Sequence, residues 1–161
     1  MAIRIIREIG DDILKKPCRE VKELTPKVTM LIDDMLETMY DAQGVGLAAP
    51  QVGVLKRIVV IDVNIEEDAQ PDPVVMINPR IVETDGEQCG DEGCLSVPGK
   101  TGTVVRPAYV KAEYLDRDFK PQVIEGRELL ARAICHELDH LDGKLYVDLV
   151  EGPLRDVQAE E

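Results

Sequence analysis

The sequence predicts an α+β fold in which short, mostly antiparallel strands pack around a central helix, with another helix near the N-terminus. Apolar residues recur at helical spacing over residues 26–42 and again over residues 127–141. The stretches between these segments have the composition of short strands, and helices do not alternate with strands as in a doubly wound parallel sheet. The 161 residues contain no repeat or linker, so residues 1–161 are expected to form one domain.

The N-terminal helix begins at a capping signal. Thr25 is a suitable N-cap, and Pro26 suits the first helical position, where its missing N–H costs no hydrogen bond. The helix should end before residues 44–46, where two glycines flank Val45 and favour a tight turn. Met30, Leu31, Met35 and Met39 recur at helical spacing along this helix.

Two extended segments are expected next. Residues 57–63 (RIVVIDV) have the pattern of a buried strand, and residues 74–82 that of an extended segment interrupted by Asn78 and Pro79. Since proline cannot donate a backbone hydrogen bond to a neighbouring strand, we expect residues 74–82 to lie near an edge of the sheet.

The middle of the chain is rich in glycine. Residues 86–102 contain five glycines and one proline, which predicts a loop or a bulged strand. Residues 109–115 alternate as a half-buried strand does, and residues 116–118 are expected to turn into a partner strand at residues 121–124.

The last predicted element is the helix at residues 127–141, which Gly143 should terminate. The acidic end, residues 157–161, is expected to fray. The core side of the helix is expected to comprise Leu130, Ile134, Leu138 and Leu141.

The composition excludes several classes of function. A formal net charge of -13 leaves no broad basic surface for phosphates, and one Phe with no Trp leaves few platforms for stacking bases, so direct nucleic-acid binding is not expected. No segment has the pattern of a signal sequence or a membrane span, so we expect a cytoplasmic protein without a membrane partner. The four cysteines are then expected to be free thiols or metal ligands.

The most informative motif is HExxH at residues 136–140, inside the second predicted helix. His136 and His140 stand four residues apart, so their imidazoles lie on nearly the same face, roughly 6 Å apart along the axis, and can reach one metal ion. Glu137 is offset by about 100° and can approach a water on that ion without being a ligand. The alternative is two surface histidines beside a solvated acidic pair, but both histidines of the chain fall in this motif.

A catalytic zinc-type site needs three protein ligands and one open position. Cys94 is the best third ligand, because its glycine-flanked surroundings let the backbone approach an ion closely. Cys135 is adjacent to His136 on the helix and points away from the face that the histidines share, so it is expected to be a small core residue.

Two other kinds of site remain open. Cys89 and Cys94 with the two histidines could form a closed structural zinc site, although 41 residues separate Cys94 from His136, far more than in a zinc finger. A zinc peptidase that cuts internal peptide bonds would also use HExxH, and the available third ligand is Glu151, eleven residues after His140.

Three blocks of the sequence resemble the peptide deformylase family. They are GVGLAAPQVG at residues 44–53, EGCLS at residues 92–96 and HELDH at residues 136–140, in the family's order. The resemblance implies a metal-dependent hydrolase, a single catalytic domain over residues 1–161, that removes the formyl group from the N-terminal formyl-methionine of new polypeptides and releases formate. Its partners would be N-formyl-methionyl nascent peptides, in transient proximity to the ribosome.

The resemblance also implies roles for the motif residues. Cys94, His136 and His140 would hold the ion, natively Fe(2+) in this family, with Zn, Ni or Co as substitutes. Glu137 would take a proton from the metal-bound water as general base and return it to the leaving amine as general acid.

Further residues would contact the substrate. The side-chain amide of Gln51 and the backbone N–H of Leu95 would donate to the oxygen that becomes negative during the reaction. From the sequence alone, Gln51 is more simply interpreted as a turn residue. Val45 and Gly46 would line the groove for the peptide chain. Leu129 and Ala133 would help form the pocket for the methionine side chain, although both also suit ordinary core positions.

The chain departs from many relatives at two positions near the motifs. Thr101 stands where many relatives carry an arginine, and Cys135 where many carry a glutamine. Some members also continue after the second helix into a longer basic helix, whereas this chain has an acidic tail. For this chain the resemblance therefore does not imply a ribosome contact through such a helix.

Overall fold

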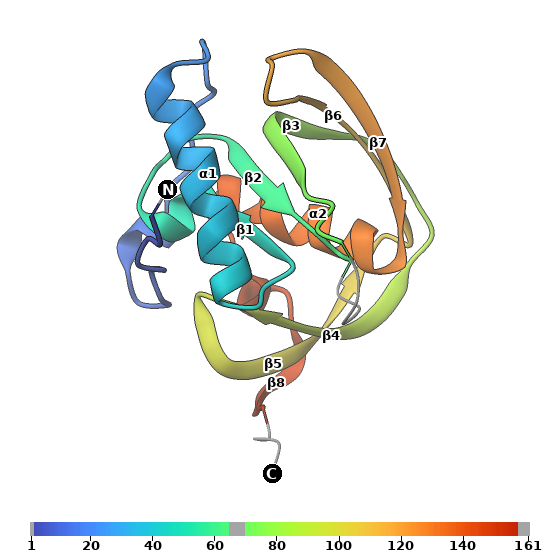
Figure 1. The fold of residues 1–161 in the computed structure, drawn as a ribbon. Coiled ribbons are helices and arrows are strands. Elements are labelled where there is room, and N and C mark those ends of the chain that lie inside the picture. Colours follow the sequence, from blue (N-terminus) through green and yellow to red (C-terminus); the bar gives the residue numbers. More distant parts are fainter. Residues whose placement is uncertain (1, 65–69, 158–161) are drawn as a thin grey trace.

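The structure is a computed structural model that describes residues 2–64 and 70–157 (Figure 1). Within these residues both sheets contain only antiparallel pairs: one has the strand order β1-β2-β3-β6-β7 and the other the order β4-β5-β8. Together with two α-helices they make an α+β fold, which confirms that prediction. The elements are η1 (Asp12–Lys15), α1 (Pro26–Asp41), β1 (Gly46–Ala48), η2 (Ala49–Val52), β2 (Ile58–Ile61), β3 (Val74–Asp85), β4 (Gln88–Cys94), β5 (Val97–Arg106), β6 (Tyr109–Leu115), β7 (Pro121–Arg127), α2 (Glu128–Leu141), η3 (Tyr146–Asp148) and β8 (Glu151–Asp156), where η marks a short 3₁₀ helix.

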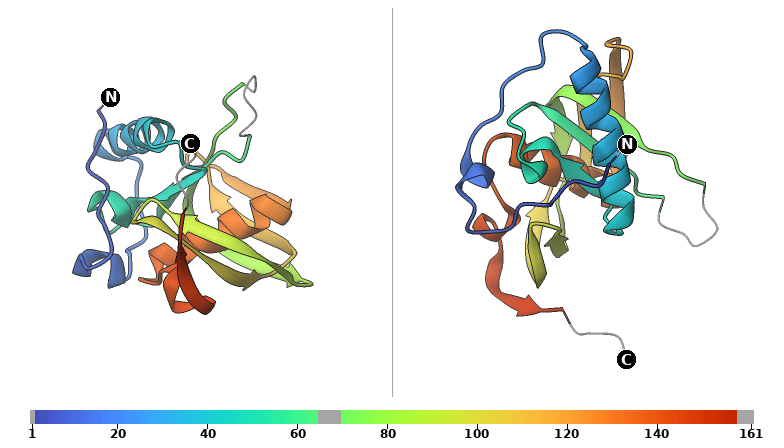
Figure 2. Two further views of the ribbon diagram at one scale, coloured as in Figure 1. Left: turned by 90° about the horizontal axis from the view of Figure 1, so that it is seen from below. Right: turned by 60° about the vertical axis from the view of Figure 1, so that its left-hand side comes forward.

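The two α-helices pack on opposite faces of the five-stranded sheet (Figures 1 and 2). Ile58 and Val60 of β2 belong to the apolar cluster that includes α1, whereas Val59 and Ile61 belong to the cluster that includes α2. Successive side chains of a strand point to opposite faces of the sheet, so this alternation places β2 between the helices. Helix α2 also contacts β5, and it therefore lies against both sheets.

Both helices begin and end within one residue of the predicted bounds. The Thr25 side chain accepts a hydrogen bond from the N–H of Val28 at 3.3 Å and so caps α1. Gly143 follows α2 with a φ of 76°, the left-handed conformation that ends many helices. No helix among the described residues has the length and apolar character needed to cross a membrane.

The expectation that residues 74–82 lie near a sheet edge is wrong. Strand β3 lies in the interior of its sheet, between β2 and β6. The register shifts between Ile77 and Arg80, so Pro79 lies in a bulge where no ladder hydrogen bond is required of it. Asn78 holds the bulge in place. Its N–H donates to the carbonyl of Arg57, its side-chain oxygen accepts from the N–H of Val21, and its side-chain nitrogen donates to the carbonyl of Val21.

The glycine-rich segment forms strands rather than a loop. Strands β4 and β5 occupy most of residues 86–102, with a register shift between Glu92 and Cys94, as the bulged-strand alternative expected. The predicted strand at residues 121–124 is longer and runs to Arg127. Strand β8 was not expected, and the part of the acidic end at residues 158–161 lies outside the described residues.

Candidate metal centre

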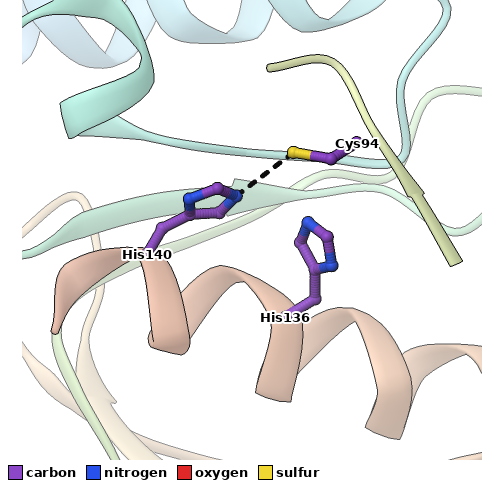
Figure 3. A group of neighbouring side chains, drawn as sticks. All are labelled: Cys94, His136 and His140. Atoms are coloured by element: carbon purple, nitrogen blue, oxygen red, sulfur yellow. Dashed lines mark hydrogen bonds between the residues drawn. The ribbon is translucent and has the colours of Figure 1, made fainter. Parts of the chain in front are cut away.

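Helix α2 and strand β4 bring three metal-ligand side chains together (Figure 3). His136 and His140 project from one face of α2, with ring centroids 5.0 Å apart. Cys94 ends β4 beside the bulge, and its Sγ lies 3.4 Å from Nε2 of His140. The ligand atoms of these three residues all lie within 4.8 Å of one another, close enough to share one ion.

The donor set suits a transition-metal ion. One cysteine sulfur and two imidazole nitrogens are the ligands that zinc and its neighbours in the first row prefer, and three protein ligands leave a position open, as catalytic sites do. Among the described residues no other histidines, cysteines and carboxylates gather in this way.

The charges around the two histidines differ. Burial lowers the pKa of His140, and the nearby His136 and Arg106 lower it further, so the His140 imidazole is neutral and keeps a lone pair for a ligand bond. Burial also lowers the pKa of His136, but Cys94 and the carboxylates of Glu137 and Glu92 outweigh burial and raise it well above its usual value. Surroundings that attract a proton to His136 also favour a bound cation.

Glu137 is a buried carboxylate that lines a pocket beside the three candidate ligands. Its Oε1 is buried and has no hydrogen-bond partner among the described residues. Burial raises the pKa of Glu137 to about 7, because the largest effect on this carboxyl is its removal from water. A carboxyl that titrates near neutral pH and has an unused oxygen is suited to accept and return a proton.

Glu92 anchors His136, and sequence reasoning missed this role. The buried Oε1 of Glu92 accepts a hydrogen bond from Nδ1 of His136 at 2.8 Å, which leaves Nε2 of that ring for an ion. Burial raises the pKa of Glu92, but hydrogen bonds from Arg106 and His136 outweigh it and lower the pKa to about 2. The only signal in the sequence was the position of Glu92 at the start of the EGCLS block.

Gln51 lies beside the ligand sulfur. It is 1% exposed, its Oε1 accepts from the N–H of Ala48 at 2.9 Å, and its Nε2 donates to Oγ of Ser96 at 2.9 Å. The same Nε2 lies 3.5 Å from Sγ of Cys94, which also accepts from the N–H of Ser96 at 3.4 Å. These contacts leave the amide of Gln51 fixed at the pocket wall, with its donor side toward the metal ligands.

A pocket of about 590 Å³ opens next to these residues. Its wall includes Glu137, Gln51 and Leu95, together with two of the three candidate ligands, Cys94 and His136. The residues expected to contact the substrate also line it: Gly46 at the start of β1 with Val45 just before it, and Leu129 and Ala133 on α2. Leu129 is 40% exposed and Ala133 is buried, so α2 lines the pocket from the protein surface to the interior.

The other candidate ligands lie apart from this group. Cys89 is exposed on β4 and is not among the side chains that converge, so the geometry does not form a closed site with two cysteines. Glu151 is exposed at the start of β8 and is also outside the group. Cys135 is buried in the apolar cluster on α2, as expected of a small core residue.

Comparisons with known proteins give a consistent picture. The family model described as polypeptide deformylase matches residues 3–155. A peptide deformylase of Agathobacter rectalis is 66% identical over 161 residues, which cover 100% of this chain and 98% of that protein.

Two solved structures have a similar fold. The peptide deformylase of Legionella pneumophila has a TM-score of 0.88 and 47% identity, with 93% of this chain and 87% of that chain covered. The peptide deformylase of Synechococcus elongatus in complex with actinonin has a TM-score of 0.85 and 42% identity, with 91% of this chain and 78% of that chain covered.

Proposed function

The chain belongs to the polypeptide deformylase family, and on this basis we propose that Cys94, His136 and His140 hold its catalytic metal ion. The enzyme removes the N-terminal formyl group from nascent polypeptides. One observation carries the proposed site: a sulfur and two imidazole ligands lie within 4.8 Å of one another beside a buried carboxylate. When bound, the ion supplies a Lewis acid that lowers the pKa of water and polarises a carbonyl group.

Glu137 is the proposed general base and general acid. Its partnerless oxygen lies at the pocket wall, where it can accept the proton of the attacking water. The amide bond between the formyl carbon and the methionine nitrogen then breaks, and Glu137 returns the proton to the leaving amine. A pKa near 7 allows one group to do both at neutral pH.

Gln51 and Leu95 are the proposed donors to the substrate oxygen. The Nε2 of Gln51 is held near Cys94, and a neutral amide can donate to a developing negative charge without competing for the attacking water's proton. The backbone N–H of Leu95 follows Cys94 directly and would be the second donor.

Four residues are proposed to bind the rest of the substrate. The backbone of Gly46, in the strand that forms one edge of the large sheet, would pair with the peptide chain, with Val45 beside it. Leu129 and Ala133 would bind the methionine side chain, since their positions on α2 give the pocket an apolar wall. Helix α2, which lies against both sheets, would then contribute both metal ligands and residues that bind the substrate.

The resemblance supports Fe(2+) as the native metal, although a site with one sulfur and two nitrogen ligands also accepts Zn, Ni or Co. We further propose that residues 1–161 act as one catalytic domain, in the cytoplasm, on N-formyl-methionyl peptides near the ribosome. Neither nucleic acid nor membrane is a proposed partner. Because the Synechococcus relative binds actinonin, the same compound is expected to occupy this pocket.

Metal content tests the ligand set directly. Wild type loaded with zinc is expected to bind one zinc ion per chain, and Cys94→Ser treated in the same way to bind much less. Cys89→Ser is the matched control, because it makes the same change on the same strand at an exposed position. Loss of zinc from Cys89→Ser with retention by Cys94→Ser would contradict the proposed site and favour a different set of ligands.

A further inference from the structure

Arg132 joins helix α2 to two strands of the small sheet. It lies one turn before His136, and its side chain is only 10% exposed. Its Nη1 donates to Oε2 of Glu92 at 2.7 Å and to the carbonyl oxygens of Val104 at 3.1 Å and Gly90 at 3.4 Å. Since Gly90 and Glu92 belong to β4 and Val104 to β5, one guanidinium group connects the helix to both strands.

The chain leaves space for this connection at Gly90. A Cβ atom at this position would lie 3.1 Å from Nη2 of Arg132, closer than side chains ordinarily approach. The φ of Gly90 is not in the left-handed region, so the backbone conformation does not require glycine. A side chain at position 90 would therefore have to displace the guanidinium group.

Arg132 also balances the charge around Glu92. Arg106 bonds to two carboxylates, those of Glu92 and Asp139, with shortest distances of 2.7 Å to each. Arg132 adds a second positive charge on Glu92, so two arginines face two carboxylates in a largely buried cluster. Without Arg132, the buried carboxylate of Glu92 would keep one arginine partner among the described residues, Arg106, which it shares with Asp139.

We propose that Arg132 is a positioning residue for the metal centre. It fixes the carboxylate of Glu92, so that His136 keeps its Nδ1–H on Glu92 and turns Nε2 toward the ion. It also holds β4, which ends at Cys94, against the helix that carries the histidines. This inference rests on the proposed metal ligands. Groups that orient a metal-binding histidine in this way commonly change metal affinity by about 10–100-fold.

The rate at which a chelator removes zinc tests this role. Arg132→Met keeps an unbranched apolar stem but removes the charge and the donors, and it is expected to release zinc about tenfold faster than wild type or more. Arg132→Lys keeps the charge and a donor, so its rate of zinc release is expected to lie between those of wild type and Arg132→Met. Arg80→Met is the control, because Arg80 is exposed on β3 and pairs only with Glu113 among the described residues.

The release rate either supports or overturns the positioning role of Arg132. Release at the wild-type rate from folded Arg132→Met overturns the proposal, even where the midpoint of thermal unfolding is lower. Should this variant fail to fold, Gly90→Ala replaces it, because the added Cβ displaces the guanidinium by a few tenths of an ångström and keeps the arginine. Faster release from Gly90→Ala supports the proposal, and unchanged release overturns it. Failure of wild type to hold zinc would instead contradict the proposed ligands.

Discussion

The carboxylate of Glu137 occupies the space that a side chain at position 46 would need. A Cβ atom on Gly46 would lie 2.5 Å from Oε2 of Glu137, so the two residues fit together only while position 46 is glycine. Gly46 begins β1 and Glu137 lies on α2, and both line the pocket. The close approach therefore joins the first sequence block to the HExxH helix at the point where the proposed proton transfer occurs.

Gly46→Ala is expected to displace Glu137 and to lower kcat about 10²-fold, within the range that acid–base catalysis supplies. The metal content should stay at the wild-type level, because the three atoms nearest to a Cβ at position 46 all belong to Glu137, which is not a proposed ligand. The measurement is kcat for formate release together with metal per chain. Wild-type turnover by this variant would show that the position of Glu137 seen here is not required.

Gln51→Glu replaces the donor of the side-chain amide by a second acceptor oxygen. Removal of one donor to a developing negative charge costs about 10²–10³-fold in kcat, and a loss of that size is expected here with zinc still bound. Gln122→Glu is the control, since it makes the same change at an exposed position on β7. Equal kcat values for the two variants would remove Gln51 from the proposed mechanism.

Iron and nickel should differ in their response to air. A cysteine thiolate on ferrous iron makes the site open to oxidation, so the iron-loaded protein is expected to lose activity on exposure to oxygen while the nickel-loaded protein keeps it. The check is residual turnover against time in air for both forms, with an anaerobic sample of each. Equal loss from both forms would show that the sensitivity to air does not depend on which metal the site holds.

Asp34 on α1 fastens the N-terminal segment. It accepts hydrogen bonds from the N–H of Ala2 at 2.7 Å and from Nε of Arg4 at 2.9 Å. Burial raises the pKa of Asp34, but these hydrogen bonds and the charge of Arg4 outweigh burial, and the pKa lies below its ordinary value of 3.8. A carboxyl with a lowered pKa in the folded state stabilises the fold above its unfolded pKa, and this contribution disappears as pH falls through the folded value.

The midpoint of thermal unfolding should therefore be lower in Asp34→Asn than in wild type at pH 7, by the equivalent of about 1–2 kcal/mol. The difference is expected to stay constant down to about pH 5 and to shrink below about pH 4. Parallel melting curves across this range measure it. A difference that grows toward acid pH would mean that the pKa of Asp34 is raised in the folded state.

The local parts of the candidate site were predictable. Two histidines four apart on a helix point the same way wherever the helix lies, and Thr25 and Gly143 mark the ends of the two helices through their own backbone chemistry. Glu92 was not predictable in the same way, because its role depends on β4 packing against α2, and no local pattern specifies which buried carboxylate meets His136.

Long-range pairing also accounts for the errors in the fold. Pro79 indicated an edge strand, but a bulge held by Asn78 lets proline occur inside the sheet. Strand β8 contains Gly152 and Pro153, which disfavour a strand, and it forms through its pairing with β5. Ion pairs from this strand to distant residues support that pairing, namely Lys100 with Asp156 and Asp91 with Arg155.

The most direct test is the release of formate from a formyl-methionyl tripeptide by protein loaded anaerobically with iron or nickel, compared with the Glu137→Ala variant. Wild type is expected to release formate only when metal is bound. Glu137→Ala should keep its metal and lose activity by about two orders of magnitude or more. Near-normal turnover by the metal-loaded variant would contradict the role of Glu137, and no release from metal-loaded wild type would contradict the proposed site as a whole.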